Sequence, residues 1–250
     1  MLDTVIAQTS HRAVRTREQN MKAAMIKYYQ APIEVGEVDA PALKNDSVLG
    51  AVRAASINPI DDILRSGAIQ DIMPLTFPHT MGYDISGEVI EVGRDVTRCK
   101  VGDAVFSRPN QTDAGAIAEV ARVKESELAM KPETLSHAEA ASVPLAGLNA
   151  WQALITRGKI RAGDKVLIHA GSGDVGTFAI QIAKHVGAHV ATTCSGRNAD
   201  LVRRLGADVV IDYKTEAFDH RKTFPMKQAA AAYEELANGH SVGKIVVLVS

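Results

Sequence analysis

The sequence predicts an α/β protein of two parts, a β-rich first part and a second part in which a parallel sheet is covered by helices. Residues 21–129 consist of short β-prone runs broken by turn residues, whereas residues 165–212 alternate between strand-like and helix-like patterns. At the start of the second part, the segment KVLIHAGSGDVGTFAIQIAK (165–184) runs from an apolar strand through a glycine-rich turn into a helix. The 250 residues are enough to bury a full core in one large domain or two smaller ones.

The first part has the pattern of a small barrel or sandwich. Its β-prone runs are residues 48–54, 87–92, 104–107 and 116–123. Ser136 and Glu139 then have the spacing of a capping box, which predicts a helix containing Ala140 and Ala141. A second helix is predicted over residues 148–157.

The second part predicts three parallel strands joined by right-handed crossovers, the first half of a Rossmann sheet. Its strands are predicted at residues 166–169, 189–193 and 209–212, and its helices from Val175 and at 199–205. Beyond it, Pro225 is expected to open a last helix over 226–237, with Gly239 past its end, and residues 244–249 to form a closing strand.

The glycine-rich turn predicts a dinucleotide site. Gly171, Gly173 and Gly176 have GxGxxG spacing, in which the first glycine permits a tight turn, the second lets the backbone approach a pyrophosphate, and the third lets helix and strand pack closely. The N–H groups that open the helix, including that of Val175, then point at the phosphates. The alternative is a tight strand-to-helix turn that binds nothing.

Composition favours a small-molecule partner. The 28 basic and 29 acidic side chains leave no net field for nucleic acid or an anionic membrane, and no apolar run approaches the roughly 20 residues that span a bilayer. Cys99 and Cys194 are the only cysteines, which fits a reducing cytoplasm. Residues 1–20 lack the apolar core of a secretory signal and are expected to be a disordered extension, with an upstream start-codon assignment or a transit peptide as alternatives.

Several motifs together resemble one family. They are ASINPID (55–61), GYDISGEV (82–89), EVG (91–93), KVGD (100–103), AASVPLAGL (140–148) and the glycine turn. The chain thereby resembles the zinc-free, zeta-crystallin-like quinone oxidoreductases of the medium-chain dehydrogenase/reductase superfamily. The resemblance implies a GroES-like catalytic domain (21–147), a partial Rossmann NADP-binding domain (148–222), and a final helix and strand (223–250) returning to the catalytic domain. It also implies hydride transfer from NADPH to a quinone or other conjugated carbonyl.

The resemblance also predicts that no metal is bound. Alcohol dehydrogenases of this superfamily bind zinc through a Cys in the first motif and a His-Glu pair in the second. Asn58 to Asp61 and the pair Tyr83 and Asp84 stand at those places here, so neither a thiolate nor an imidazole is present to act as a zinc ligand.

The end of the second Rossmann strand predicts a preference for NADPH. An NAD enzyme places Asp or Glu there to bind the ribose 2′-hydroxyl, whereas this chain has Ser195 and Arg197, which suit a 2′-phosphate. Tyr213 matches a family position near the adenine ribose. The alternative is an ordinary polar loop.

The resemblance assigns the catalytic positions to Asn58, Asp61 and Tyr83. Asn58 is predicted to contact substrate or nicotinamide, although Asn beside Pro59 is also a common turn former. Tyr83 is predicted either to donate a hydrogen bond or to form an aromatic wall. Asn149, where the family usually has Thr, is predicted to lie near the nicotinamide and still to donate a hydrogen bond.

Compared with the family that it resembles, the chain is expected to lack the second half of the Rossmann domain between residues 218 and 223, roughly 60 to 90 residues at about 30 per βαβ unit. Residues 166–169 are therefore expected to form an edge strand, which predicts pairing with another copy or poor solubility. Asp174 stands where relatives carry Gly or Ala, and its charge is expected to weaken pyrophosphate binding. The sequence thus predicts an NADPH-dependent quinone or enone oxidoreductase, with a catalytically inactive chain that keeps a nucleotide half-site as the alternative.

Overall fold

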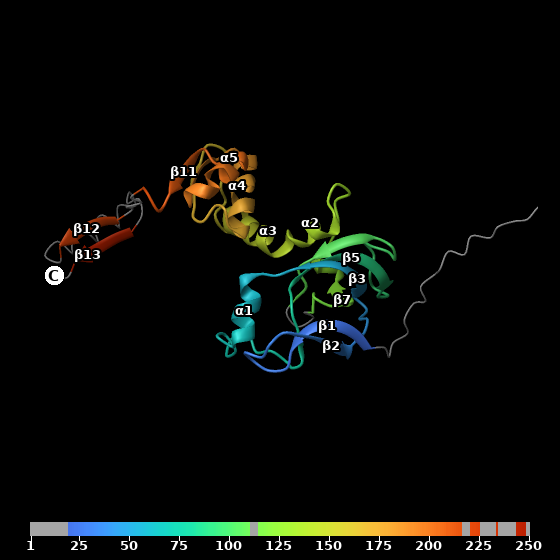
Figure 1. The fold of residues 1–250 in the computed structure, drawn as a ribbon. Helices are drawn as coiled ribbons and strands as arrows, with labels where there is room; N and C mark the ends of the chain where they lie inside the picture. The colour runs from blue at the N-terminus through green and yellow to red at the C-terminus, as the bar shows by residue number, and fades with distance from the viewer. Residues whose placement is uncertain (1–19, 111–114, 217–220, 226–233, 235–243, 249–250) are drawn as a thin grey trace, which may run out of the picture. The chain divides into compact units, whose positions relative to one another are not determined.

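The computed structural model describes residues 20–110, 115–216, 221–225, 234 and 244–248 (Figure 1). The chain forms two units that divide between Asn149 and Ala150. The first holds the β-rich sequence and the second holds the alternation of strand and helix, which confirms the predicted α/β fold class. In the part of the chain that is described, no helix is both long and apolar enough to cross a membrane.

Two antiparallel sheets build the first unit. Their strands are β1 (Asn20–Ile26), β2 (Glu34–Asp39), β3 (Ser47–Ser56), β4 (His79–Thr80), β5 (Asp84–Val92), β6 (Ala104–Ser107), β7 (Val120–Lys124) and β8 (Leu128–Met130). Their order is β7-β3-β5-β6-β8 in one sheet and β2-β1-β4 in the other. β-branched residues, which suit a pleated surface, fill the core of the larger sheet. Its buried members include Val48, Ile85, Val89, Val105 and Val123.

The central strands of the larger sheet are bent. The pairing of β3 with β5 shifts register twice, between Leu49 and Gly50 and between Val52 and Ala54, and such irregularities curl a sheet. Gly87 lies opposite this bend, where an added Cβ would stand 2.2 Å from the carbonyl oxygen of Ala51. A side chain at Gly87 would therefore force the two central strands apart.

The predicted strand over residues 116–123 was wrong at its start, because β7 begins at Val120. The preceding backbone bonds to the other sheet instead. The N–H of Ile117 donates to the carbonyl oxygen of Met81, and the carbonyl oxygen of Ile117 accepts the N–H of Ala24. These residues thus join the two sheets rather than lengthen one of them.

Three α-helices accompany these sheets: α1 (Pro59–Ser66), α2 (His137–Ala141) and α3 (Pro144–Trp151), the last of which crosses the unit boundary. The capping box is confirmed, since the Ser136 hydroxyl accepts the N–H of Glu139 and the Glu139 carboxylate accepts the N–H of Ser136. The helix predicted from residue 148 was wrong at its start. α3 begins at Pro144, whose missing N–H costs nothing in a first turn, and Gln152–Arg157 continues as a π-helix.

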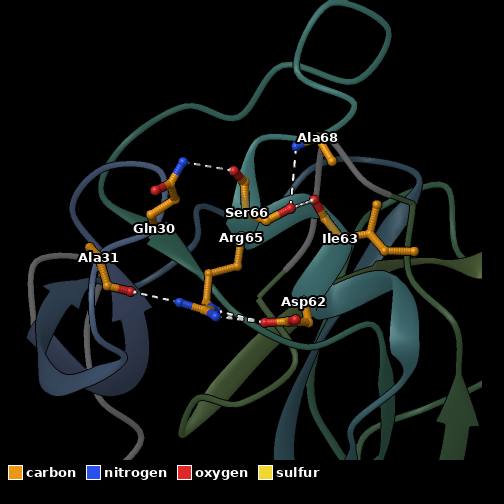
Figure 2. A network of polar contacts seen from close by, with 7 residues as sticks. All are labelled: Gln30, Ala31, Asp62, Ile63, Arg65, Ser66 and Ala68. Atoms are coloured by element: carbon orange, nitrogen blue, oxygen red, sulfur yellow. Dashed lines mark hydrogen bonds and ion pairs between the residues drawn. The ribbon is translucent and has the colours of Figure 1, made fainter.

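Polar contacts fix the C-terminal end of α1 (Figure 2). The Arg65 guanidinium pairs with Asp62 at 2.7 Å and donates to the carbonyl oxygen of Ala31 at 3.3 Å. The Gln30 side chain donates to the carbonyl oxygen of Ser66, and the Gln30 N–H donates to that of Arg65. The helix that carries Asp61 is therefore held by contacts at its far end.

The second unit contains the predicted parallel sheet. Its elements are β9 (Lys165–Ile168), α4 (Asp174–Val186), β10 (His189–Cys194), α5 (Ala199–Arg204) and β11 (Val209–Asp212), with a 3₁₀ turn at Gly196–Asn198. The strands are parallel in the order β11-β10-β9, which confirms the predicted half of a Rossmann sheet. Ile180 of α4, Val190 of β10 and Val202 of α5 are fully buried between helices and sheet.

The edge of this sheet is formed by β9, which pairs only with β10 among the described residues. The strands β12 (Arg221–Pro225) and β13 (Lys244–Leu248) pair with each other in parallel, which confirms the closing strand. Pro225, which was predicted to precede a last helix, is the last residue of β12, where a strand at the edge of its sheet tolerates proline. Glu234, the one described residue of that predicted helix, is helical. Apart from Glu234, the helix predicted over 226–237 lies outside the described residues, as do Gly239 and residues 1–19 of the predicted extension.

Candidate functional site

A buried carboxylate organises the polar residues of the first unit. Asp84, the first residue of β5, is fully buried and accepts three hydrogen bonds of 2.9 Å. The donors are the Ser56 hydroxyl, the Asn58 side-chain Nδ2 and the backbone N–H of Leu145 in the first turn of α3. We call these four residues the Asp84 cluster. It joins the end of β3, the start of α1, β5 and α3.

Asp61 lies beside this cluster, on the first turn of α1. Its side chain is 4% exposed, and its Oδ2 accepts the N–H of Asn58, the N-cap residue of α1, at 2.6 Å. Among the described residues, its Oδ1 has no hydrogen-bond partner. Burial raises the pKa of Asp61 above its ordinary value, opposed by the backbone N–H groups of Asn58 and Gly82.

Burial also raises the pKa of Asp84. Its hydrogen bonds from Asn58, Ser56 and Leu145 oppose this shift, as does the positive charge of Arg108. Burial thus resists the ionisation of two neighbouring carboxyl groups, while hydrogen-bond donors favour the charged form of each of them.

Tyr83 precedes Asp84 and is 1% exposed. The guanidinium carbon of Arg108 lies 5.9 Å from the centre of its ring, within the range of a cation–π contact. Arg108 is only partly buried, so it brings a positive charge to the edge of the cluster. No motif signals this arginine in the sequence. Its role is visible only because β5 and β6 are paired.

The glycine turn of the second unit depends on close backbone packing. An added Cβ at Gly171 would lie 2.0 Å from the Thr192 hydroxyl oxygen, and one at Gly176 would lie 2.4 Å from the carbonyl oxygen of Ala170. The left-handed residue of the turn is Ala170, with φ of 52°. Gly171 permits the turn because β10 approaches it too closely for a side chain.

Asp174 is exposed and is the first residue of α4, with Gly173 as the N-cap. Its Oδ1 accepts the backbone N–H of Val175 at 2.8 Å. That N–H belongs to the helix end that phosphate groups use in dinucleotide sites. The Asp174 carboxylate therefore occupies one of the N–H donors that are predicted to bind pyrophosphate.

The residues predicted to bind the 2′-phosphate follow β10 and β11. Ser195 is buried, Arg197 is exposed, and Tyr213 is 57% exposed, with its N–H donating to the carbonyl oxygen of Cys194. Asn198 ties this loop to the glycine turn, because its Nδ2 donates to the Ser172 hydroxyl at 3.0 Å. The structure thus brings the turn and the predicted 2′-phosphate loop together.

Two further residues, Asp212 and Asn149, bear on cofactor binding. Asp212, the last residue of β11, was not foreseen as a neighbour of this loop, yet its Oδ2 would lie 2.5 Å from a Cβ added at Gly196. Pairing of Cys194 with Asp212 across the parallel strands places it there. Asn149, predicted near the nicotinamide, is an exposed residue of α3 in the first unit.

These residues fit the adenosine and pyrophosphate portions of a nicotinamide dinucleotide. Because Gly171 and Gly176 have no side chain, strand and helix can pack as closely as such a site requires. The N-terminus of α4 offers the backbone N–H groups that commonly bind anions. Ser195 and Arg197 add a hydroxyl and a positive charge. Among the described residues, no group of three or more His, Cys, Asp or Glu side chains is placed to hold a metal ion.

Comparison with known proteins identifies the family. Residues 44–133 match the alcohol dehydrogenase GroES-like domain, and residues 175–249 match the zinc-binding dehydrogenase domain. The solved quinone oxidoreductase from Coxiella burnetii is 32% identical, with a TM-score of 0.75, and the match covers 92% of this chain and 83% of that one. The chain belongs to the quinone oxidoreductase-like group of the medium-chain dehydrogenase/reductase superfamily.

Curated relatives agree with this membership. The chain is 42% identical over 184 residues to a chloroplastic quinone-oxidoreductase homolog of Spinacia oleracea, covering 72% of this chain and 56% of that protein. It is 40% identical to the human mitochondrial NAD(P)H oxidoreductase RTN4IP1, covering 70% and 48%. The chain thus spans about half the length of the curated relatives it matches. A mycobacterial relative 32% identical, with a TM-score of 0.69, was solved in complex with NADPH, and the match covers 87% of this chain and 64% of that one.

Proposed function

We propose that this chain is an NADPH-dependent, zinc-independent oxidoreductase that transfers hydride to a quinone or another conjugated carbonyl. The observation that carries the proposal is the glycine turn leading into α4, linked through Asn198 to the Ser195 and Arg197 loop. Relatives named quinone oxidoreductase and NAD(P)H oxidoreductase support the reaction class.

The residues of the second unit would hold the cofactor. Gly171, Gly173 and Gly176 keep side chains away from the pyrophosphate, while the N-terminal N–H groups of α4, including that of Val175, bind it. Ser195 and Arg197 bind the 2′-phosphate, and Tyr213 lies against the adenine ribose. When bound, NADPH supplies the hydride. Asp174 opposes binding by its charge and by occupying the N–H of Val175.

The residues of the first unit would orient the substrate. Asn58 and Asn149 are amide donors suited to the carbonyl oxygens of substrate or nicotinamide, and a donor at an oxygen that gains charge lowers the barrier. Asp61 and Tyr83 are buried beside the cluster and limit the access of water to it. Zinc independence is supported by the donor chemistry, since Asn58, Asp61, Tyr83 and Asp84 include neither thiolate nor imidazole.

A turnover assay tests the proposal. Purified chain is mixed with NADPH and a soluble quinone, and the loss of NADPH absorbance is followed with and without a metal chelator. We expect quinone-dependent oxidation that the chelator does not change. Binding of NADPH without its oxidation would contradict the proposed activity and favour a catalytically inactive chain that keeps a nucleotide half-site. Loss of activity on addition of the chelator would contradict zinc independence.

We further propose that the chain forms a homo-oligomer through the edge of β9 that has no partner strand among the described residues. Leu167 is 39% exposed on this strand, and an uncovered edge offers unpaired backbone groups to another strand. Light scattering after gel filtration is expected to show a dimer or larger species. A soluble, compact monomer at all concentrations would overturn this proposal.

A further inference from the structure

We propose that Asp84 is the positioning residue of this site, whose buried carboxylate fixes the side-chain amide of Asn58 and the first turn of the helix that carries Asn149. This inference rests on the proposed function for its effect on turnover. Its structural content, the orientation of Asn58 by Asp84, is independent of catalysis.

The chemistry of the three contacts sets the orientation of Asn58. A carboxylate only accepts hydrogen bonds, so the group that Asn58 turns toward Asp84 Oδ2 at 2.9 Å must be its Nδ2 and not its Oδ1. The amide nitrogen carries a second hydrogen, which Asp84 leaves free. Asn58 retains 6% of its surface exposed whereas Asp84 retains none. Asn58 is therefore the less enclosed member of this pair, and it is the one that we place against a substrate oxygen.

The other carboxylate oxygen sets the start of α3. Asp84 Oδ1 accepts the N–H of Leu145 at 2.9 Å, and a negative charge is favourable at the N-terminus of a helix. Leu145 and Asn149 are four residues apart, so they lie on the same face of α3. One carboxylate thus holds Asn58 directly and Asn149 through a single helical turn, and both residues are predicted to contact the reacting groups.

The substitution D84N tests this arrangement because it preserves shape while removing one acceptor. The introduced amide has a single oxygen for three donors. Ser56 can adapt by rotating its hydroxyl, but the Leu145 N–H cannot, so Asn58 must turn its own oxygen toward the new NH₂ group. The second hydrogen of the Asn58 amide then leaves the position that the proposal assigns to it as a donor. D103N, which makes the same change at a carboxylate paired with Lys100, is the matched control.

We expect D84N to lower kcat for quinone reduction roughly 100- to 1,000-fold, as when a donor to a charged oxygen is lost. The Kd for NADPH should stay within about twofold, because the second unit holds the cofactor's phosphates, whereas D103N should leave both constants unchanged. Unchanged kcat in a folded D84N protein would overturn the proposal, as would a loss of kcat matched by an equal loss of NADPH affinity.

Two NMR readouts do not depend on turnover. The side-chain amide signal of Asn58, assigned with N58A, should move in D84N and not in D103N. The second readout uses the unaltered protein and so needs no variant to fold. As pH is varied, the Asn58 amide signal should shift with the same midpoint as the signal of the Asp84 carboxyl carbon. If the protein proves inactive, the proposed function fails while these signals still decide the positioning role. A signal that neither moves nor titrates would overturn that role.

Discussion

The Asp84 cluster and the glycine turn are organised in opposite ways. Asp84 is fully buried and its carboxylate has three donors in place, so this part of the first unit is complete before any ligand arrives. Gly173 and Asp174 are exposed at the open end of α4, where the chain's own carboxylate bonds the N–H of Val175. Hydrogen bonding therefore shapes the Asp84 cluster, whereas the close approach of chain segments shapes the glycine turn.

The largest effect is expected from a side chain placed in the glycine turn. G176V should abolish NADPH binding and lower the melting temperature of the second unit, because even a Cβ would lie 2.4 Å from the carbonyl oxygen of Ala170. G173A is the control for stability alone, since its Cβ would meet that same oxygen at 3.2 Å, whereas its NADPH binding should also fall because Gly173 is proposed to face the pyrophosphate. Thermal melts and NADPH fluorescence titrations of both variants measure the difference. Equal tolerance of the two changes would show that backbone packing does not shape this site.

The next effect concerns the charge at the start of α4. D174A should bind NADPH about 1–2 kcal/mol more tightly, roughly 5- to 30-fold, because it frees the N–H of Val175 and removes a repulsive charge. The empty protein should lose roughly 0.3–1 kcal/mol of stability, since an acid favours a helix N-terminus. D174N, which can keep the hydrogen bond but not the charge, should fall between. Weaker binding by D174A would contradict the competing role of this carboxylate.

A smaller effect is expected at the 2′-phosphate loop. R197A should weaken NADPH binding roughly 2- to 5-fold, the range of an exposed ion pair, and leave NADH binding unchanged. Asp212, which lies next to Gly196, carries a negative charge that should weaken NADPH binding, so D212N should bind NADPH more tightly. Titrations at low and high salt measure both. An equal loss of affinity for the two cofactors in R197A would remove the argument for NADPH.

The smallest effect is a dependence of stability on pH in the first unit. Burial raises the pKa of Asp61 above 3.8, so the folded state keeps its proton to higher pH than the unfolded state does. The free energy of unfolding contributed by this group therefore falls as pH rises from 3.8 through the raised pKa. D61N removes this titration, and its stability relative to the unaltered protein should increase with pH.

Asp103 provides the control of opposite sign. Its hydrogen bond with Lys100 lowers its pKa, so its contribution to stability is present above the ordinary value and is lost as pH falls through the lowered pKa. The relative stability of D103N should therefore decrease as pH rises over that window. Denaturant unfolding across the acidic range compares the two variants. Parallel slopes for D61N and D103N would contradict the assignment of opposite shifts.

Local patterns predicted most of the fold. The capping box at Ser136, the strand at residues 104–107 and the alternation around the glycine turn each depend on neighbours within a few positions, and all are observed. The spacing of Gly176 also indicated the close packing that the structure contains at that residue. The first residue of α3 was harder to predict from the sequence, because a helix that begins at Pro144 and one that begins at Leu148 are both compatible with the same apolar run.

The candidate site could be predicted only in part. Asp84 bonds residues that lie 28, 26 and 61 positions away in the sequence, so its role as a common acceptor follows from the folded sheet and not from any motif. The contact of Arg108 with Tyr83 likewise depends on the pairing of β6 with β5. Asp212 lies next to the loop of Ser195 and Arg197 only because of the register in which β11 pairs with β10.

The most direct test of this account is a titration of the purified chain with NADPH and with NADH, followed by the fluorescence of the reduced nicotinamide. We predict saturable binding of both cofactors, with NADPH bound more tightly and with D174A tightening both. An absence of binding to either the unaltered protein or D174A would contradict the central claim that the glycine turn of the second unit is a dinucleotide site.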